Sequence, residues 1–290
     1  HFAFGEGLGA ALGPKTPEPD VLNFSWRDYG NRVGVWRCLE LFDELNLPAA
    51  HLINTTVFDY APQIVDALKA RGDEFIGHGR TNAERHGQMW EADEKRFLEE
   101  VRDAIEKASG KRPRGWMAPW MASTRWTPDI LKEVGFDFLM DWPNDDQPLW
   151  MRTRSGPLLL VPYPVEINDS PQIIHRQHTA REFCDMLVDQ FEEMIEQCAQ
   201  HPLVCNISIH PFVFGQPFRL RPLRRAIRHC RKTCSIGCPN PRSIPSDSAA
   251  TSSARRTSPA RVWAAMCGLL SLPRGSGEDR ARTRSWPGRS

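Results

Sequence analysis

Apolar residues alternate between two patterns over the first 230 positions. Apolar residues at steps of three and four predict helices over 31–46, 59–70, 91–109, 179–200 and 220–229, and a further helix that begins at residue 127. Short apolar runs predict strands over 49–53, 74–77, 136–142, 158–163 and 203–209, and a short strand or loop over 115–120. Helices therefore alternate with strands that are apolar on both faces. This order predicts parallel strands covered by helices, as in a barrel or a doubly wound sheet.

Polar side chains follow the ends of four predicted strands. They are His78, then Asp141 with Asp145 and Asp146, then Glu166 with Asn168 and Asp169, and finally His210. In α/β folds of this kind, ligands bind beyond the carboxyl ends of the strands. We therefore expect these acids and histidines to gather at one edge of the sheet.

The stretch 72–86 holds the densest group of such residues. A short strand ends at His78 between two glycines, and Asn82 and His86 follow at steps of four. The three side chains would share one face if this segment were helical. The alternative is a surface loop that carries two ordinary histidines.

Composition narrows the class of protein. With 40% apolar and 25% charged residues among 290, the chain is typical of a globular protein. The whole chain carries a net charge of +1, but residues 231–290 hold ten Arg and one Lys against only three acids. The first 230 residues are therefore mildly acidic. An acidic body argues against nucleic-acid binding, and no apolar run predicts a membrane span or signal peptide. We expect a cytoplasmic protein, in which the scattered cysteines stay reduced.

The pattern predicts one catalytic domain over 1–229, followed by a low-complexity basic tail over 230–290. The tail lacks helical or strand periodicity and is rich in Ser, Arg and Pro. Either it is a disordered segment that binds acidic partners, or a frameshift has replaced the natural end of the domain. The first residue is His1 rather than Met, which indicates a fragment or a processed start.

Two kinds of chemistry fit these residues. In a mononuclear metal hydrolase, His78 and an acid would begin the metal site, with His210 as acid or base. Alternatively, the same histidines and carboxylates would activate water directly. Several tryptophans could line the pocket of a ring-shaped substrate, or could simply pack in the core: Trp116, Trp120, Trp126, Trp142 and Trp150.

Four segments in order, 26–36, 72–79, 144–150 and 209–211, resemble the polysaccharide deacetylase (NodB-homology) superfamily, and within it the allantoinase-like branch. The resemblance spans about residues 1–229. It implies a distorted (β/α) barrel and hydrolysis of a non-peptide C–N bond, in an N-acetyl sugar or a cyclic ureide, in carbohydrate or ureide metabolism. The barrel would be incomplete at the N-terminus, because the strand with the family's early Asp pair would lie before His1.

The resemblance also carries residue roles. His210 matches the late catalytic histidine, and His78 matches the first histidine of the metal-binding H-x-x-x-H motif, whose second position is Asn82. Met117-Ala118-Pro119 stands where deacetylases have an arginine-proline motif. These departures favour the allantoinase-like branch, in which no metal is assumed; a divalent metal such as zinc is the alternative.

On this reading His78 and His210 are catalytic, and one of Asp145, Asp146 or Glu166 handles protons with His210. Asn82, Trp116, Trp120 and Trp142 would bind the substrate, a small molecule with an amide or N-acetyl group. The protein could also form a homo-oligomer, which the sequence does not decide. The alternative function is a catalytically inactive relative that binds a sugar or ureide.

Overall fold

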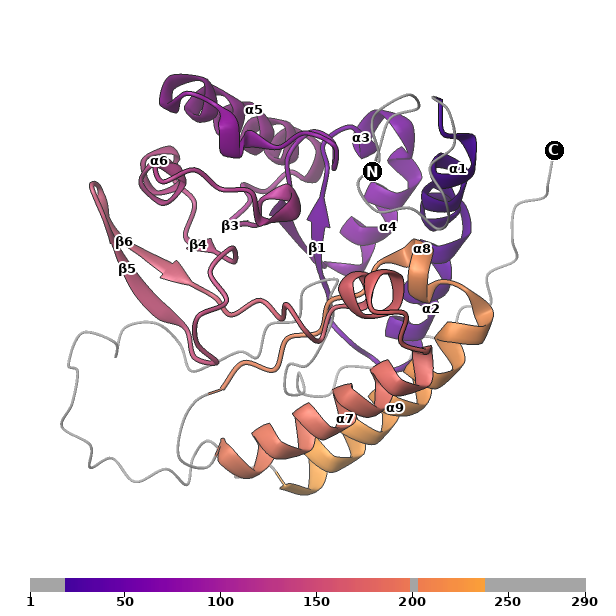
Figure 1. The fold of residues 1–290 in the computed structure, drawn as a ribbon. Coiled ribbons are helices and arrows are strands. Elements are labelled where there is room, and N and C mark those ends of the chain that lie inside the picture. The colour runs from indigo at the N-terminus through magenta and orange to yellow at the C-terminus, as the bar shows by residue number, and fades with distance from the viewer. Residues whose placement is uncertain (1–18, 199–202, 238–290) are drawn as a thin grey trace.

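The computed structural model describes residues 19–198 and 203–237, which form helices around a central six-stranded sheet (Figure 1). The strand order is β1-β2-β3-β4-β6-β5. All neighbouring strands are parallel except β5 and β6, which form an antiparallel hairpin. The strands are β1 (Ala50–Ile53), β2 (Glu74–Gly77), β3 (Gly115–Trp116), β4 (Phe138–Leu139), β5 (Leu149–Thr153) and β6 (Gly156–Leu160).

The described residues contain the expected helices and also helical segments over 21–29, 170–175 and 211–214 that the sequence pattern did not predict. Those before β5 are α1 (Val21–Tyr29), the π-helix η1 (Gly30–Gly34), α2 (Val35–Glu44), α3 (Val57–Tyr60), α4 (Pro62–Arg71), α5 (Glu91–Ser109) and α6 (Thr127–Val134). Those after β6 are the π-helix η4 (Ser170–His175), α7 (Ala180–Gln197), α8 (Pro211–Phe214) and α9 (Pro217–Gly237). Two short 3-10 turns are η2 (His86–Gln88) and η3 (Pro119–Met121). In Figure 1, α7 and α9 lie side by side below the sheet.

Both faces of the sheet are apolar, as the sequence predicts for parallel strands. Ile53, Trp116 and Leu139 pack in the main core together with the helices. The alternate positions of the same strands, among them Ile76 and Phe138, form a second apolar cluster. Successive strand residues point to opposite faces, so the continuous apolar runs serve two separate clusters. The open α/β fold with a mostly parallel sheet is confirmed.

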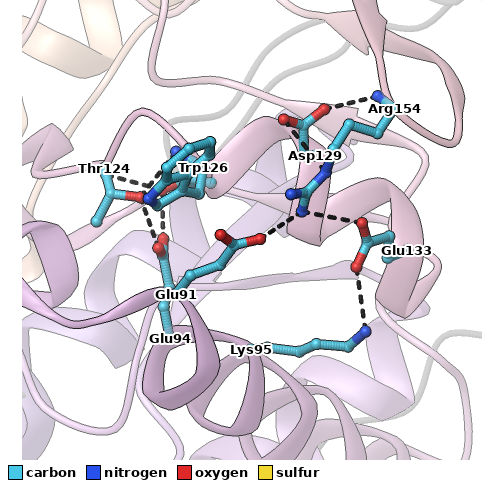
Figure 2. A network of polar contacts seen from close by, with 9 residues as sticks. Glu91, Glu94, Lys95, Thr124, Trp126, Asp129, Glu133 and Arg154 are labelled. Atoms are coloured by element: carbon cyan, nitrogen blue, oxygen red, sulfur yellow. Dashed lines mark hydrogen bonds and ion pairs between the residues drawn. The ribbon is translucent and has the colours of Figure 1, made fainter.

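A polar network attaches the β5–β6 hairpin to α5 and α6 (Figure 2). Arg154, at the turn of the hairpin, forms ion pairs with Glu91 at 2.6 Å and Glu133 at 3.0 Å. Deeper in the fold, the hydroxyls of Thr124 and Thr127 donate to the fully buried carboxylate of Glu94. The network thus has an exposed half around Arg154 and a buried half around Glu94.

Several expected boundaries differ in the structure. The sequence pattern missed β5, because its residues are only partly buried and give no continuous apolar run. The expected strand over 203–209 is an extended segment with one ladder bridge, between Asn168 and Ser208. Helix α9 continues beyond His229 to Gly237, and Cys230 is buried in the core. The expected tail therefore begins later than residue 230, and its remainder, 238–290, lies outside the described residues.

Within the described ranges, no helix is both long and apolar enough to cross a lipid bilayer.

Candidate active site

A cavity of about 170 Å³ opens at the carboxyl ends of β1 and β2. Asn54 follows β1 and His78 follows β2, and both line the cavity. The segment 208–212 closes the opposite side and contributes His210. The predicted edge therefore exists, and it brings together three of the expected site residues: His78, Asn82 and His210.

Strand register explains why these residues meet. Ile53 pairs with Gly77, and Gly77 pairs with Trp116, so neighbouring strands end at the same level. The residues that follow, Asn54, His78 and Met117, are consequently adjacent along the edge. The Asn54 amide donates a hydrogen bond to the His78 carbonyl, which joins the first two strand ends.

The imidazole of His78 is held from both sides. Its Nδ1 donates to the Met117 carbonyl at 2.7 Å, and its Nε2 lies 2.9 Å from Asn82 Oδ1. Burial lowers the pKa of His78 to about 4, so the ring is neutral at pH 7. With the proton on Nδ1, Nε2 is an acceptor, so the Asn82 amide must be flipped to place its NH₂ rather than Oδ1 against the ring.

His210 is oriented by a buried carboxylate. Its Nδ1 donates to Asp169 Oδ1 at 2.6 Å, and its backbone N–H donates to Asp169 Oδ2 at 2.8 Å. Asp169 is fully buried, whereas the His210 side chain is 35% exposed and lines the cavity. Burial raises the pKa of Asp169, while the hydrogen bonds from His210 oppose that rise. The arrangement fixes the ring tautomer with a lone pair on Nε2.

The loop that carries His210 packs directly on η1. A Cβ at Gly34 would lie 2.1 Å from the Pro211 carbonyl oxygen, and a Cβ at Gly30 would lie 2.8 Å from the Phe212 nitrogen. Only glycine permits these backbone contacts. The helix expected over 31–46 starts as the π-helical turn η1, which borders the cavity, and is α-helical from Val35. Such π-helical turns are frequent at functional sites.

Arg27 supplies a positive charge to the cavity. It lies over the rings of Trp26 and Phe212, 5.7 Å from each centroid, and donates to the Asn23 carbonyl. Burial lowers the pKa of Arg27 to about 10, which still leaves the guanidinium protonated at neutral pH.

The three carboxylates expected to work with His210 lie elsewhere. Asp145 and Asp146 are exposed in the loop before β5, and neither lines the cavity. Glu166 is also exposed, and it pairs with Arg176 at 3.4 Å. The carboxylate that contacts His210 is Asp169, three residues after Glu166.

The tryptophans do not form the walls of this cavity. Trp116 is fully buried in the main core, as the core-packing alternative requires. Trp120 and Trp142 are 41% and 43% exposed and lie outside the cavity lining. Trp120 nevertheless donates its indole N–H to the Asn82 carbonyl at 2.7 Å, and so supports the loop that carries Asn82.

His86 does not join His78 and Asn82. The segment between them is a series of bends rather than a helix, so the expected common face is not formed. His86 is fully buried between the rings of Phe97 and Trp116, on the core side of the loop.

Asp141 lies at the same sheet edge, after β4. Its carboxylate accepts hydrogen bonds from the Ala118 backbone N–H at 2.8 Å and from the Ser123 hydroxyl. Burial raises the pKa of Asp141 to about 6. It is not part of the cavity lining, and its contacts join two loops of the edge.

The donors present do not fit a zinc centre. Protein zinc sites use three or four His, Cys, Asp or Glu ligands. Over 19–198 and 203–237, no three such side chains converge as a metal site. Around His78 the candidate ligands are one imidazole nitrogen and one amide group. We therefore derive no step through a metal.

Sequence reasoning omitted three residues from the site: Asp169, Arg27 and Asn54. Asp169 is one of several acids that follow predicted strands, so its position in the sequence did not distinguish it from the others. Arg27 belongs to the segment 26–36 that carries part of the family resemblance. Asn54 directly follows a predicted strand, which is the signal that identified His78.

Comparisons with known proteins agree with this architecture. Residues 16–139 match the family model "Polysaccharide deacetylase". The peptidoglycan deacetylase of Helicobacter pylori is 26% identical over 262 residues, which cover 78% of this chain and 85% of that protein.

Two solved structures are also similar. The crystal structure of PuuE allantoinase is 29% identical, with a TM-score of 0.67 over 72% of this chain and 69% of that one. A probable polysaccharide deacetylase of Pseudomonas aeruginosa is 27% identical, with a TM-score of 0.68 over 80% of this chain and 77% of that one. Residues 16–139 therefore carry a polysaccharide deacetylase domain, a family whose members are hydrolases of carbon–nitrogen bonds.

Proposed function

We propose that this protein hydrolyses an amide bond of a compact polar substrate held between His78, Asn82 and His210. The observation that carries the proposal is the hydrogen bond between His210 Nδ1 and the buried Asp169, which leaves His210 Nε2 as the free basic nitrogen at the cavity. An imidazole held in this way can accept a proton at Nε2 and return it, as general acid–base catalysis requires.

The steps follow from the positions of the side chains. His210 Nε2 takes a proton from a water molecule as that water attacks the amide carbon. The charge that develops on the amide oxygen is stabilised by the Asn82 amide and by the positive charge of Arg27. As the C–N bond breaks, the leaving nitrogen takes the proton back from His210, so one histidine serves as base and then as acid.

His78 has a supporting part in this proposal. Its neutral ring, fixed by Met117, holds the Asn82 amide through Nε2. Asn82 can then direct its second N–H toward the substrate. Asp169 acts through His210 as a positioning residue and does not touch the substrate.

Two substrate classes remain, and each has an observation in its favour. A cyclic ureide such as allantoin agrees with the small cavity, with Asn82 at the second motif position and with the similarity to an allantoinase. An N-acetylated sugar agrees with the family match and with the similarity to a peptidoglycan deacetylase. We favour the ureide, because Asn82 stands where the metal-binding H-x-x-x-H motif has its second histidine.

The test supplies allantoin and N-acetylglucosamine oligomers separately to the purified chain, and follows ring opening and acetate release. We expect turnover of allantoin that a chelator does not abolish, and a loss of about 100-fold or more in His210→Ala. Acetate release that a chelator removes would select the sugar and a metal. A folded protein that turns over neither substrate would refute hydrolysis and return the binding-only alternative, which the comparisons do not favour.

Cytoplasmic location and homo-oligomer formation stay predictions. Cell fractionation and light scattering test them.

A further inference from the structure

A second cavity, of about 610 Å³, lies between the start of α7 and the first turns of α9. Its lining contains four arginines and no Asp or Glu: Arg181, Arg219, Arg221 and Arg225. The lining also contains the polar residues Gln177, His178 and Thr179 and the exposed ring of Phe218. Its volume is in the range of sites that bind small molecules.

The arginines of α9 differ according to the side of the helix they occupy. Arg224 and Arg228 lie outside the cavity lining, and both pair with Glu44. Arg221 and Arg225 line the cavity, and across the described ranges neither has a carboxylate within ion-pair distance. The same helix therefore neutralises its guanidinium groups on one side and leaves them unneutralised on the other.

The two other arginines of the lining, Arg181 and Arg219, also form no ion pair within the described part of the chain. Arg219 contacts the Val213 carbonyl at 3.5 Å and lies over the Phe218 ring at 4.9 Å. The nearest carboxylate to His178 is Glu182 at 4.0 Å, and that carboxylate already accepts from the Thr179 backbone N–H. Thr179 and Glu182 form a capping box that already satisfies backbone N–H groups at the start of α7. The positive charge of the cavity therefore comes from the arginine side chains and not from the helix end.

Four guanidinium groups around one cavity repel one another unless an anion lies between them. The planar guanidinium binds carboxylate, sulfate and phosphate through two parallel hydrogen bonds. From this arrangement we propose that the cavity is a binding site for a small ligand that carries two or more phosphate, sulfate or carboxylate groups. The site is separate from the hydrolytic cavity, although Arg219 is close enough to Asp169 to stabilise its charge.

Two variants of equal charge test the proposal. Arg221→Gln/Arg225→Gln removes two arginines that line the cavity. Arg224→Gln/Arg228→Gln removes two from the same helix outside it. Calorimetric titration with inorganic tripolyphosphate should show binding to the unaltered protein, about tenfold or more weaker binding in the first variant and a change below about twofold in the control. Thermal unfolding of both variants checks that they are folded.

Phe218→Ala separates two sources of such a ligand. If a heparin-derived tetrasaccharide binds more tightly than tripolyphosphate and loses affinity in Phe218→Ala, the ligand is an acidic sugar whose ring contacts Phe218. If tripolyphosphate binds at least as well and Phe218→Ala has no effect, the ligand is a free polyanion. Absence of binding by either probe, or equal losses in both double variants, would overturn the proposal. Because the readout is binding, failure here is distinct from failure of the hydrolytic function.

Discussion

The substitution Asp169→Asn tests the proposed role of the buried carboxylate. Asp169 accepts two hydrogen bonds from His210, one from the ring and one from the backbone. Asparagine has a single acceptor oxygen. If the backbone N–H keeps that oxygen, the amide NH₂ faces Nδ1, and the ring must carry its proton on Nε2. The nitrogen at the cavity then has no lone pair to accept a proton from water.

The size of the effect follows from this change of tautomer. General acid–base catalysis by a positioned histidine contributes about 10²- to 10⁴-fold. A residual fraction of the correct tautomer should survive, so we expect kcat to fall by about 10²- to 10³-fold, or about 2.7–4 kcal/mol in activation free energy. KM should change little, because Asp169 is fully buried and does not reach the substrate.

Folding is expected to survive this substitution. Burial raises the pKa of Asp169, which means that its ionised form lowers the free energy of unfolding, and the neutral amide removes that cost. The assay is steady-state hydrolysis of the substrate that the unaltered protein turns over, with thermal unfolding measured in parallel.

Glu166→Gln is the matched control. It makes the same carboxylate-to-amide change three residues away, on an exposed side chain outside the cavity. We expect its kcat to stay within about twofold of the unaltered protein, as for surface substitutions away from a site. A normal kcat in Asp169→Asn, or an equal loss in Glu166→Gln, would refute the assignment of Asp169 as the partner of His210.

Three further predictions concern stability. Thr127→Val takes a donor from the buried Glu94 carboxylate in Figure 2 and should lower the free energy of unfolding by about 1–3 kcal/mol. Arg154→Gln, at the exposed half of the network, should cost clearly less, and equal costs by urea unfolding would contradict this division. The pKa of Asp141 is raised to about 6 in the folded protein, so its contribution to stability is full below its unfolded pKa and is lost as pH rises through 6. The free energy of unfolding should therefore fall by up to about 3 kcal/mol over this pH range, and Asp141→Asn should abolish that fall. An unchanged dependence of stability on pH in the variant would count against this prediction. Gly34→Ala places a Cβ against the Pro211 backbone and should destabilise by about 2 kcal/mol or more; a normal melting temperature would show that the helix can move aside.

Local pattern was sufficient where one signal runs from end to end of an element. The strand over 74–77 is a short buried run, and the helix over 91–109 keeps one apolar period up to Gly110, so both have the predicted limits. The strand β5 was not predictable in this way. Its burial alternates between partly buried and exposed positions, but Trp150 occupies an exposed one, so the residue types do not show that alternation. The helix predicted from residue 127 does begin at Thr127, but the Thr127 hydroxyl donates to Glu94 of α5 instead of capping its own helix. A tertiary partner thus replaced a local one.

What the sequence by itself determined is the alternation of helices and strands, the polar edge at the strand ends, and the two histidines that meet there. Those features depend on side-chain period and on chain direction, which are local. The choice of Asp169 over Glu166 or the pair Asp145 and Asp146 was decided only by tertiary structure, because all four acids follow strands and only one is buried against His210. The separation of His78 from His86 was decided in the same way, since the loop between them turns one side chain to the cavity and the other to the core.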